Sequence, residues 1–235
     1  MNAESTLKAF DPSTGLTTTC WTLDCPEIPF RSMAVNREGV AYLETHTQRM
    51  FRASTLDTSC EPTPFIPYGQ GESSFVSFGM AFVPDISTAV ETLYIAGEAN
   101  GSMPIDPGKT SIWLGSIDTI SFSAQHIASL FPPASAGVGL TGTPDGRLFA
   151  VSLNYFFELD RSTGQILGET IPIPLPPDTS TMTLAFWGGD FYIFNDVTVN
   201  PPPAEGTYWY SIVVRYRPSD GSFTTVMTFP YDHIY

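Results

Sequence analysis

The sequence has few charged residues, few lysines and no long hydrophobic run, and each shortage excludes a class of protein. Charged residues make up 14% of the 235 residues, and the only lysines are Lys8 and Lys109. The formal net charge is −14. Such a field repels phosphate backbones, so we expect no nucleic-acid partner. No run of about eighteen apolar residues is present, so we expect no transmembrane segment. Residues 1–6 lack the basic and apolar pattern of a signal peptide.

Cysteine is also scarce and odd in number, with Cys20, Cys25 and Cys60. No CxxC pair and no Cys/His ligand spacing occurs, so a zinc site is not expected. If the protein is exported, one disulfide and one free thiol is the simplest account. Helical periodicity is missing as well, because no segment of useful length repeats at 3.6 residues.

What the sequence does contain is a repeated turn between short apolar strands. Copies stand at residues 10–15 (FDPSTG), 54–59, 117–122, 159–164 and 216–221. The hydrophobic fraction of 42% supports a real core, and 21 Pro and 19 Gly suit many turns. Units of short strands repeating every forty to sixty residues or so are typical of a β-propeller.

Placing the strands between these turns predicts a single all-β domain over residues 1–235. Hairpins with Gly or Asp-Gly turns mark three blades, at about residues 30–70, 137–178 and 180–230, and a hairpin with a longer turn around residues 84–91 marks a fourth, at about residues 75–133. The first turn has no hairpin before it. We therefore expect a five-bladed ring whose last blade is shared between the termini, built from residues 6–23 and 231–235, with no evident second strand. A β-sandwich is the alternative.

The strand order brings polar residues to one face of such a ring, where second strands end and first strands begin. Two long loops, at residues 98–110 and 196–208, lie there and either form a binding mouth or reflect neutral growth. Carboxylate and amide oxygens suit Ca²⁺, and the expected ligands are Glu44, Glu98, Asn154, Asn195 and Asp196. Alternatively the Asn and Asp residues cap turns, and the acidic charge serves solubility.

Other side chains at this face complete the expected site. The expected catalytic bases and acids are His46, Asp232 and His233, because a bound cation could polarise an ester or phosphoryl oxygen while one of them activates water. The expected substrate-binding residues are Arg31, Ser32, Tyr208 and Trp209. Strand packing is the alternative role for the aromatic pair.

Several segments resemble an uncharacterised group of myxobacterial secreted proteins and lipoproteins that carry a small β-propeller. The resemblance rests on residues 23–25, 32–35, 59–63, 91–94, 140–143 with 145–149, 185–192 and 217–221. It implies an exported or cell-surface protein, although this chain has no signal peptide. It also implies a disulfide between Cys25 and Cys60, with Cys20 free.

The polar face is similar in architecture to that of calcium propeller hydrolases of the gluconolactonase, paraoxonase and diisopropyl fluorophosphatase type. Those families use a Glu, Asn and Asp set at the channel, and Glu44, Asn154, Asn195 and Asp196 match that set. The resemblance implies a calcium-assisted hydrolase of esters, lactones or phosphotriesters. Separately, we expect the protein to be a monomer. The alternative is a non-catalytic secreted or surface propeller that recognises glycan or protein.

Overall fold

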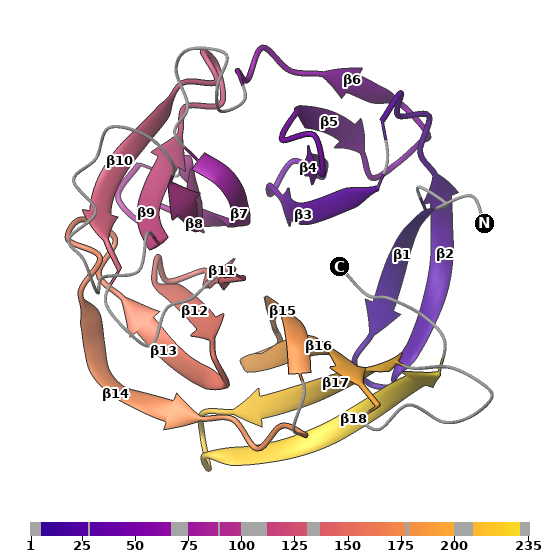
Figure 1. Ribbon diagram of the computed structural model, residues 1–235, viewed down its shortest axis with the longest axis vertical. Coiled ribbons are helices and arrows are strands. Elements are labelled where there is room, and N and C mark those ends of the chain that lie inside the picture. The colour runs from indigo at the N-terminus through magenta and orange to yellow at the C-terminus, as the bar shows by residue number, and fades with distance from the viewer. Residues whose placement is uncertain are drawn as a thin grey trace.

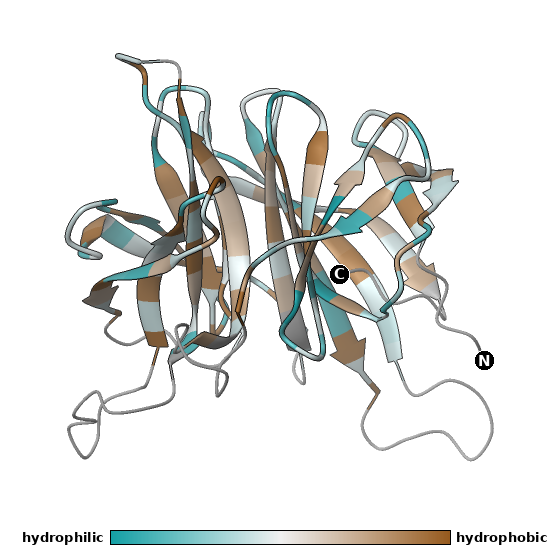
Figure 2. Ribbon diagram, turned by 90° about the horizontal axis from the view of Figure 1, so that it is seen from above, coloured by the Kyte–Doolittle hydropathy of each residue, from teal (hydrophilic) through white to brown (hydrophobic). Residues whose placement is uncertain are grey.

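The computed structural model consists of β-strands joined by turns, and its sheets stand around a common axis (Figure 1). It describes residues 6–27, 29–66, 75–88, 90–99, 112–130, 137–176, 179–199 and 209–230. No helix occurs in these ranges, and so none that could cross a membrane. Hydrophobic residues concentrate along the strands and polar residues at the turns (Figure 2).

Four of the sheets are four-stranded antiparallel meanders in which each strand pairs with the next in sequence. We call them blades 1 to 4, and their strands a to d from the axis outward. Blade 1 is β3(Phe30–Val35), β4(Val40–Thr45), β5(Met50–Ser54) and β6(Cys60–Pro62). Blade 2 is β7(Phe75–Pro84), β8(Glu91–Ala99), β9(Ile112–Ile117) and β10(Ala124–Ser129). Blade 3 is β11(Gly139–Gly142), β12(Leu148–Ser152), β13(Tyr155–Leu159) and β14(Ile166–Pro172). Blade 4 is β15(Thr179–Trp187), β16(Asp190–Thr198), β17(Trp209–Arg217) and β18(Ser222–Pro230).

The four a strands approach one another near the axis, where β3 packs beside β7, β7 beside β11, and β11 beside β15. Glycine permits this close approach. A Cβ placed on Gly79 would lie 2.0 Å from the carbonyl oxygen of Val138, and one on Gly142 would lie 2.1 Å from that of Phe82. Backbone therefore meets backbone between adjacent a strands, which no larger residue would allow.

Apolar side chains fill the spaces between successive blades, so both faces of each sheet are covered. One buried cluster joins blades 1 and 2 around Tyr42, Phe78 and Leu93. A second joins blades 2 and 3, and a third joins blades 3 and 4 around Phe149 and Phe191. Burial on both faces explains why the b strands are almost continuously apolar instead of alternating.

The expectation of a five-bladed ring is wrong, because the structure has four blades. The remaining strands, β1(Thr6–Asp11) and β2(Leu16–Thr22), form only a two-stranded sheet within the described residues. We call it the ribbon, and it lies between blade 4 and blade 1 (Figure 1). The proposed closing segment, residues 231–235, lies outside the described residues.

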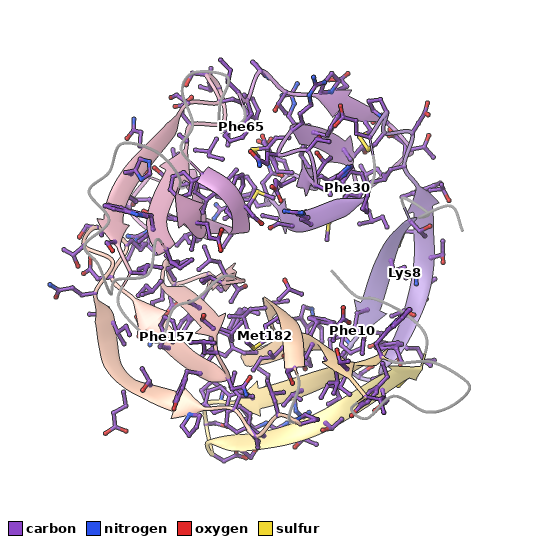
Figure 3. The ribbon with its side chains drawn as sticks, viewed as in Figure 1. Lys8, Phe10, Phe30, Phe65, Phe157 and Met182 are labelled. Carbon is purple, nitrogen blue, oxygen red and sulfur yellow. A yellow bond between two sulfur atoms is a disulfide. The ribbon has the colours of Figure 1, made fainter. Side chains whose placement is uncertain are left out.

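The ribbon is attached at both sides by contacts distant in sequence. On the blade 4 side, the Phe10 ring lies edge-on to Phe194 with centroids 5.5 Å apart and to Tyr192 at 6.0 Å (Figure 3). On the blade 1 side, the Trp21 indole nitrogen donates to the carbonyl of Thr55 at 3.1 Å. A disulfide between Cys25 and Cys60, with Cα atoms 5.0 Å apart, fastens the segment after the ribbon to β6. The ribbon thus bridges blades 4 and 1.

The five copies of the turn motif join strands that are adjacent at the outer edge of the ring. In four of them an Asp carboxylate accepts the backbone N–H of a residue two or three positions later; the residues are Asp11, Asp57, Asp118 and Asp160. In the copy at residues 216–221 the same bond is made by Asp220, which holds the N–H of Ser222. The motif recurs because the side chain imitates a backbone turn.

Candidate functional site

The site expected from the sequence lies on the face where β4, β8, β12 and β16 end, which we call the b–c face. It brings together the C-terminal ends of the b strands and the starts of the a strands, as an antiparallel meander requires. Glu44, Glu98 and Asp196 are at these b-strand ends in blades 1, 2 and 4. Three carboxyl groups from three blades therefore occupy corresponding positions.

A register shift in the neighbouring a strand accompanies each of the three carboxyl groups. The shifts lie between Phe30 and Ser32, between Phe75 and Ser77, and between Thr179 and Thr181. In each case the residue after the shift is Ser or Thr and pairs with the acid, giving Ser32 with Glu44, Ser77 with Glu98 and Thr181 with Asp196. β-Bulges often lie beside active sites, where they redirect side chains.

Strand alternation sets the direction in which each acid points. Glu44 shares a sheet face with Tyr42, which belongs to the cluster between blades 1 and 2. Glu98 shares a face with Ala96, which packs between blades 2 and 3. Asp196 shares a face with Phe194, which contacts the ribbon. Each acid thus faces the next unit around the ring.

Glu44 has the most unusual environment of the three. Its side chain is 0% exposed, and neither carboxyl oxygen has a hydrogen-bond partner in the described part of the protein. Burial raises the pKa of the Glu44 carboxyl to about 8, while the positive charge of Arg31 opposes the rise. Glu44 is therefore mainly a neutral carboxylic acid at neutral pH and can donate a proton.

Asp196 and Asn195 are both buried at the end of β16 but point to opposite faces of the sheet. The Asp196 carboxylate accepts a hydrogen bond from the Ser211 hydroxyl on β17. The Asn195 amide nitrogen donates to the carbonyl of Ile193 at 3.1 Å, and its oxygen has no partner within the described ranges. Two adjacent residues of one strand cannot ligate a single ion on one side of it.

Other expected site residues are placed apart from the buried acids. Asn154 is exposed at φ 64° in a tight turn after Leu153, which has φ 48°, so its conformation is that of a turn residue. His46 is exposed in the turn after β4, where its backbone N–H donates to Pro29 at 3.2 Å. Trp209 is 38% exposed at the start of β17. Asp232, His233 and Tyr208 lie outside the described residues.

The expected calcium ligands do not converge. Across the described ranges no group of three or more His, Cys, Asp and Glu side chains could hold a metal ion. Glu44, Glu98 and Asp196 belong to three different blades and face three different neighbours. The donor set proposed from the sequence therefore does not fit one ion.

Sequence reasoning missed the register shifts and the Ser211 partner of Asp196. A bulge leaves little trace in a sequence, because the extra residue continues the strand. Ser211 did leave a signal. It is a polar residue at the start of a strand that continues with the apolar run Ile212-Val-Val214. In the structure Ser211 is fully buried, and a buried hydroxyl requires a hydrogen-bond partner.

Comparison with known proteins supports the fold. The structure is similar to a GH43 endo-arabinanase from Bacillus licheniformis, with a TM-score of 0.52 and 14% identity over 82% of this chain and 75% of that one. It is also similar to an exo-β-1,3-galactanase from Phanerochaete chrysosporium, with a TM-score of 0.57 and 10% identity over 90% of this chain. The match covers 52% of the galactanase, so this chain spans about half its length.

A third similar structure is an exo-β-1,3-galactanase from Clostridium thermocellum, with a TM-score of 0.53 and 11% identity over 85% of this chain and 47% of that one. No family model and no curated protein matches the sequence. The comparisons therefore give no named homologue for the myxobacterial group or for the calcium propeller hydrolases. What they show is a β-propeller similar to those of glycoside hydrolases.

Proposed function

We propose that this protein is a hydrolase of glycosidic bonds that acts at the b–c face, with Glu44 as the general acid. The observation that carries the proposal is the Glu44 carboxyl, which is buried without a hydrogen-bond partner in the described structure and whose pKa is raised to about 8. Glycoside hydrolysis needs one carboxyl group that holds its proton at neutral pH. The fold similarity to glycoside hydrolases agrees with this substrate class.

The second group that the reaction needs is a carboxylate that can reach water. Glu98 is only partly buried, whereas Asp196 is 4% exposed and bound by Ser211, so we assign this role to Glu98. Glu44 gives its proton to the glycosidic oxygen as the bond to the anomeric carbon breaks. Water attacks that carbon, and Glu98 accepts the proton that the water loses. Because Glu44 faces blade 2 and Glu98 faces blade 3, this pair requires the glycan to lie across the b–c end of blade 2, between the two acids. Neighbouring side chains must move to expose Glu44 to the substrate.

Ester, lactone and phosphotriester hydrolysis has less support. The calcium ion that was expected to drive it lacks a converging donor set among the described residues. A non-catalytic glycan-binding propeller remains the second candidate, and the complete burial of Glu44 in this structure favours it. The Cys25–Cys60 disulfide supports export under either proposal, because such bonds persist in oxidising compartments.

Hydrolysis of arabinan, β-1,3-galactan, a p-nitrophenyl ester and a phosphotriester, with and without EDTA, tests these functions together. We expect cleavage of a glycan that EDTA does not affect, and a fall of activity as the pH rises through about 8. Glu44→Gln should lower kcat/KM by about 100-fold or more, while Glu61→Gln on exposed β6 should not change it. Glycan binding without cleavage would favour the second candidate, and EDTA-sensitive ester cleavage would refute the proposal.

A further inference from the structure

Arg31 differs from the other basic side chains of the structure in having no acidic or backbone oxygen bound to it. The protein has 24 acidic residues against 10 basic ones, so a basic side chain readily finds an acidic partner. Arg161 donates to the carbonyl of Pro84. Carboxylate partners are bound by Arg37, Arg49, Arg52, Arg147, Arg215 and Arg217. Arg31 makes no hydrogen bond or ion pair within the described part of the chain.

The position of Arg31 is set by the register shift at the start of β3. Phe30 pairs with Thr45 and Ser32 with Glu44, so Arg31 is the extra residue that has no partner on β4. It is exposed on the b–c face, close enough to Glu44 for its charge to favour the ionised form of that carboxyl. Bulges often redirect side chains beside binding and active sites, and this one places an unpaired guanidinium at the edge of the candidate site.

Glu44 does not neutralise this guanidinium, because at neutral pH Glu44 mainly keeps its proton. The positive charge of Arg31 therefore remains available, and the adjacent neutral acid does not repel an incoming anion. A guanidinium binds a carboxylate or a sulfate through two parallel N–H donors, which gives both affinity and orientation.

We propose that Arg31 binds an anionic group of the ligand and that the substrate class of this site is an acidic glycan, carrying uronate carboxylates or sulfate esters. This inference rests on the proposed glycan site at the b–c face. It adds a specificity-determining residue that touches the ligand through charge and takes no part in the proton transfers. The overall net charge of −14 opposes acidic ligands, so selectivity for them must come from a local group such as Arg31.

Binding measurements by titration calorimetry test the proposal with matched pairs of glycans. Polygalacturonate is compared with its fully methyl-esterified form, and sulfated galactan with desulfated galactan. The measurements use Glu44→Gln protein, in which cleavage is suppressed and the neutral state of residue 44 is preserved. We expect the protein to bind one acidic member at least tenfold more tightly than its neutral partner, and the pair that shows this distinguishes carboxylate from sulfate.

Three further variants, each made in the Glu44→Gln protein, test the role of Arg31. Arg31→Ala should remove the preference for the acidic glycan and leave affinity for the neutral one within about twofold. Arg31→Lys should keep part of the preference, since it retains charge but loses the two-point geometry. Arg52→Ala serves as control, because the Arg52 guanidinium is already bound, to Glu61 at 3.5 Å and to the Tyr42 side chain. Equal affinity for acidic and neutral glycans, or an unchanged preference in Arg31→Ala, would overturn the proposal.

Cleavage assays with the native protein separate this inference from the proposed function. A preference that depends on Arg31, without cleavage of any glycan, supports the inference and refutes the hydrolase. Cleavage of glycans with no preference for acidic over neutral members, or with a preference that Arg31→Ala leaves unchanged, supports the hydrolase and refutes the inference. Neither binding nor cleavage of any glycan refutes both.

Discussion

Replacement of Glu44 by Gln should change the pH dependence of stability by an amount that follows from its burial. The pKa of Glu44 rises from an ordinary value of 4.5 to about 8 on folding. Between these values the folded state keeps the proton and the unfolded state releases it, so folding is disfavoured progressively as the pH rises. The stabilising contribution of the neutral acid is complete below pH 4.5 and is lost as the pH rises through about 8.

The magnitude follows from the width of this interval. From pH 4.5 to pH 7 the wild type should lose roughly 3 kcal/mol relative to Glu44→Gln, at ~1.4 kcal/mol for each pH unit. Gln has nearly the same shape and does not titrate. Its own unpaired amide adds a cost that does not depend on pH, so the slope of the difference is the diagnostic quantity and its absolute value is not.

Urea unfolding of both proteins from pH 4.5 to pH 9, with the disulfide intact, measures this difference. The exposed turn carboxylates act in the opposite direction. Hydrogen bonds from Ser162 and Thr163, for example, lower the pKa of Asp160 to about 2, so its contribution is lost at acidic pH. These groups are common to both proteins and cancel. A difference in unfolding free energy that stays constant across the range would refute the claim that Glu44 is neutral in the folded state.

Two structural predictions accompany this one. Removal of the disulfide by the double substitution Cys25→Ala and Cys60→Ala should lower the free energy of unfolding by about 4 kcal/mol, as loop entropy predicts for a separation of 35 residues. The control Cys20→Ser, at an exposed free thiol, should cost almost nothing. Equal losses in the two variants would refute the pairing of Cys25 with Cys60. Gly79→Ala should lower the unfolding free energy by ~1–3 kcal/mol, because its Cβ would lie 2.0 Å from the Val138 carbonyl oxygen. A loss below about 0.5 kcal/mol would show that the a strands are not packed backbone to backbone.

The propeller itself could be predicted because its signals are local. Each turn motif needs an Asp and a nearby Ser or Gly, and the turns between the a and b strands of blades 1, 3 and 4 contain a Gly or Asp-Gly, all within a few residues of one another. Asp160, for instance, holds the N–H groups of Ser162 and Thr163 without help from the rest of the chain. Such turns were the basis for placing the strands along the sequence.

The number of blades could not be predicted in this way. The turn at residues 10–15 looks the same whether it joins two strands or belongs to a full blade, since the hydrogen bonds that the Asp11 carboxylate accepts from Ser13 and Thr14 are internal to the turn. What attaches the ribbon is the packing of Phe10 on Tyr192 and Phe194 and the bond from Trp21 to Thr55. These contacts join residues far apart in sequence, so no local sequence pattern predicts them.

The sequence could predict on which face of the ring the acidic residues lie, but it could not predict the surroundings of each acid. Strand order alone brings Glu44, Glu98 and Asp196 to the b–c face. Their environments depend on tertiary packing, which leaves Glu44 without a hydrogen-bond partner in the described structure and gives Asp196 a bond from Ser211. The calcium set includes two residues that the strand pattern itself separates. It combined Asn195 with Asp196, and strand alternation sends adjacent side chains to opposite faces.

Corresponding positions at the ends of the b strands therefore differ from blade to blade in residue type and in surroundings. Blades 1, 2 and 4 each place an acid opposite a hydroxyl residue after a register shift, whereas in blade 3 the a strand begins at Gly139 opposite Val151, with no acid. Catalysis by two carboxyl groups requires that their environments differ, since one must hold a proton and the other must accept one. A repeat that supplies corresponding backbone positions and unequal surroundings meets this requirement. Under the proposed mechanism, the burial of Glu44 beside Arg31 assigns the proton donor to blade 1.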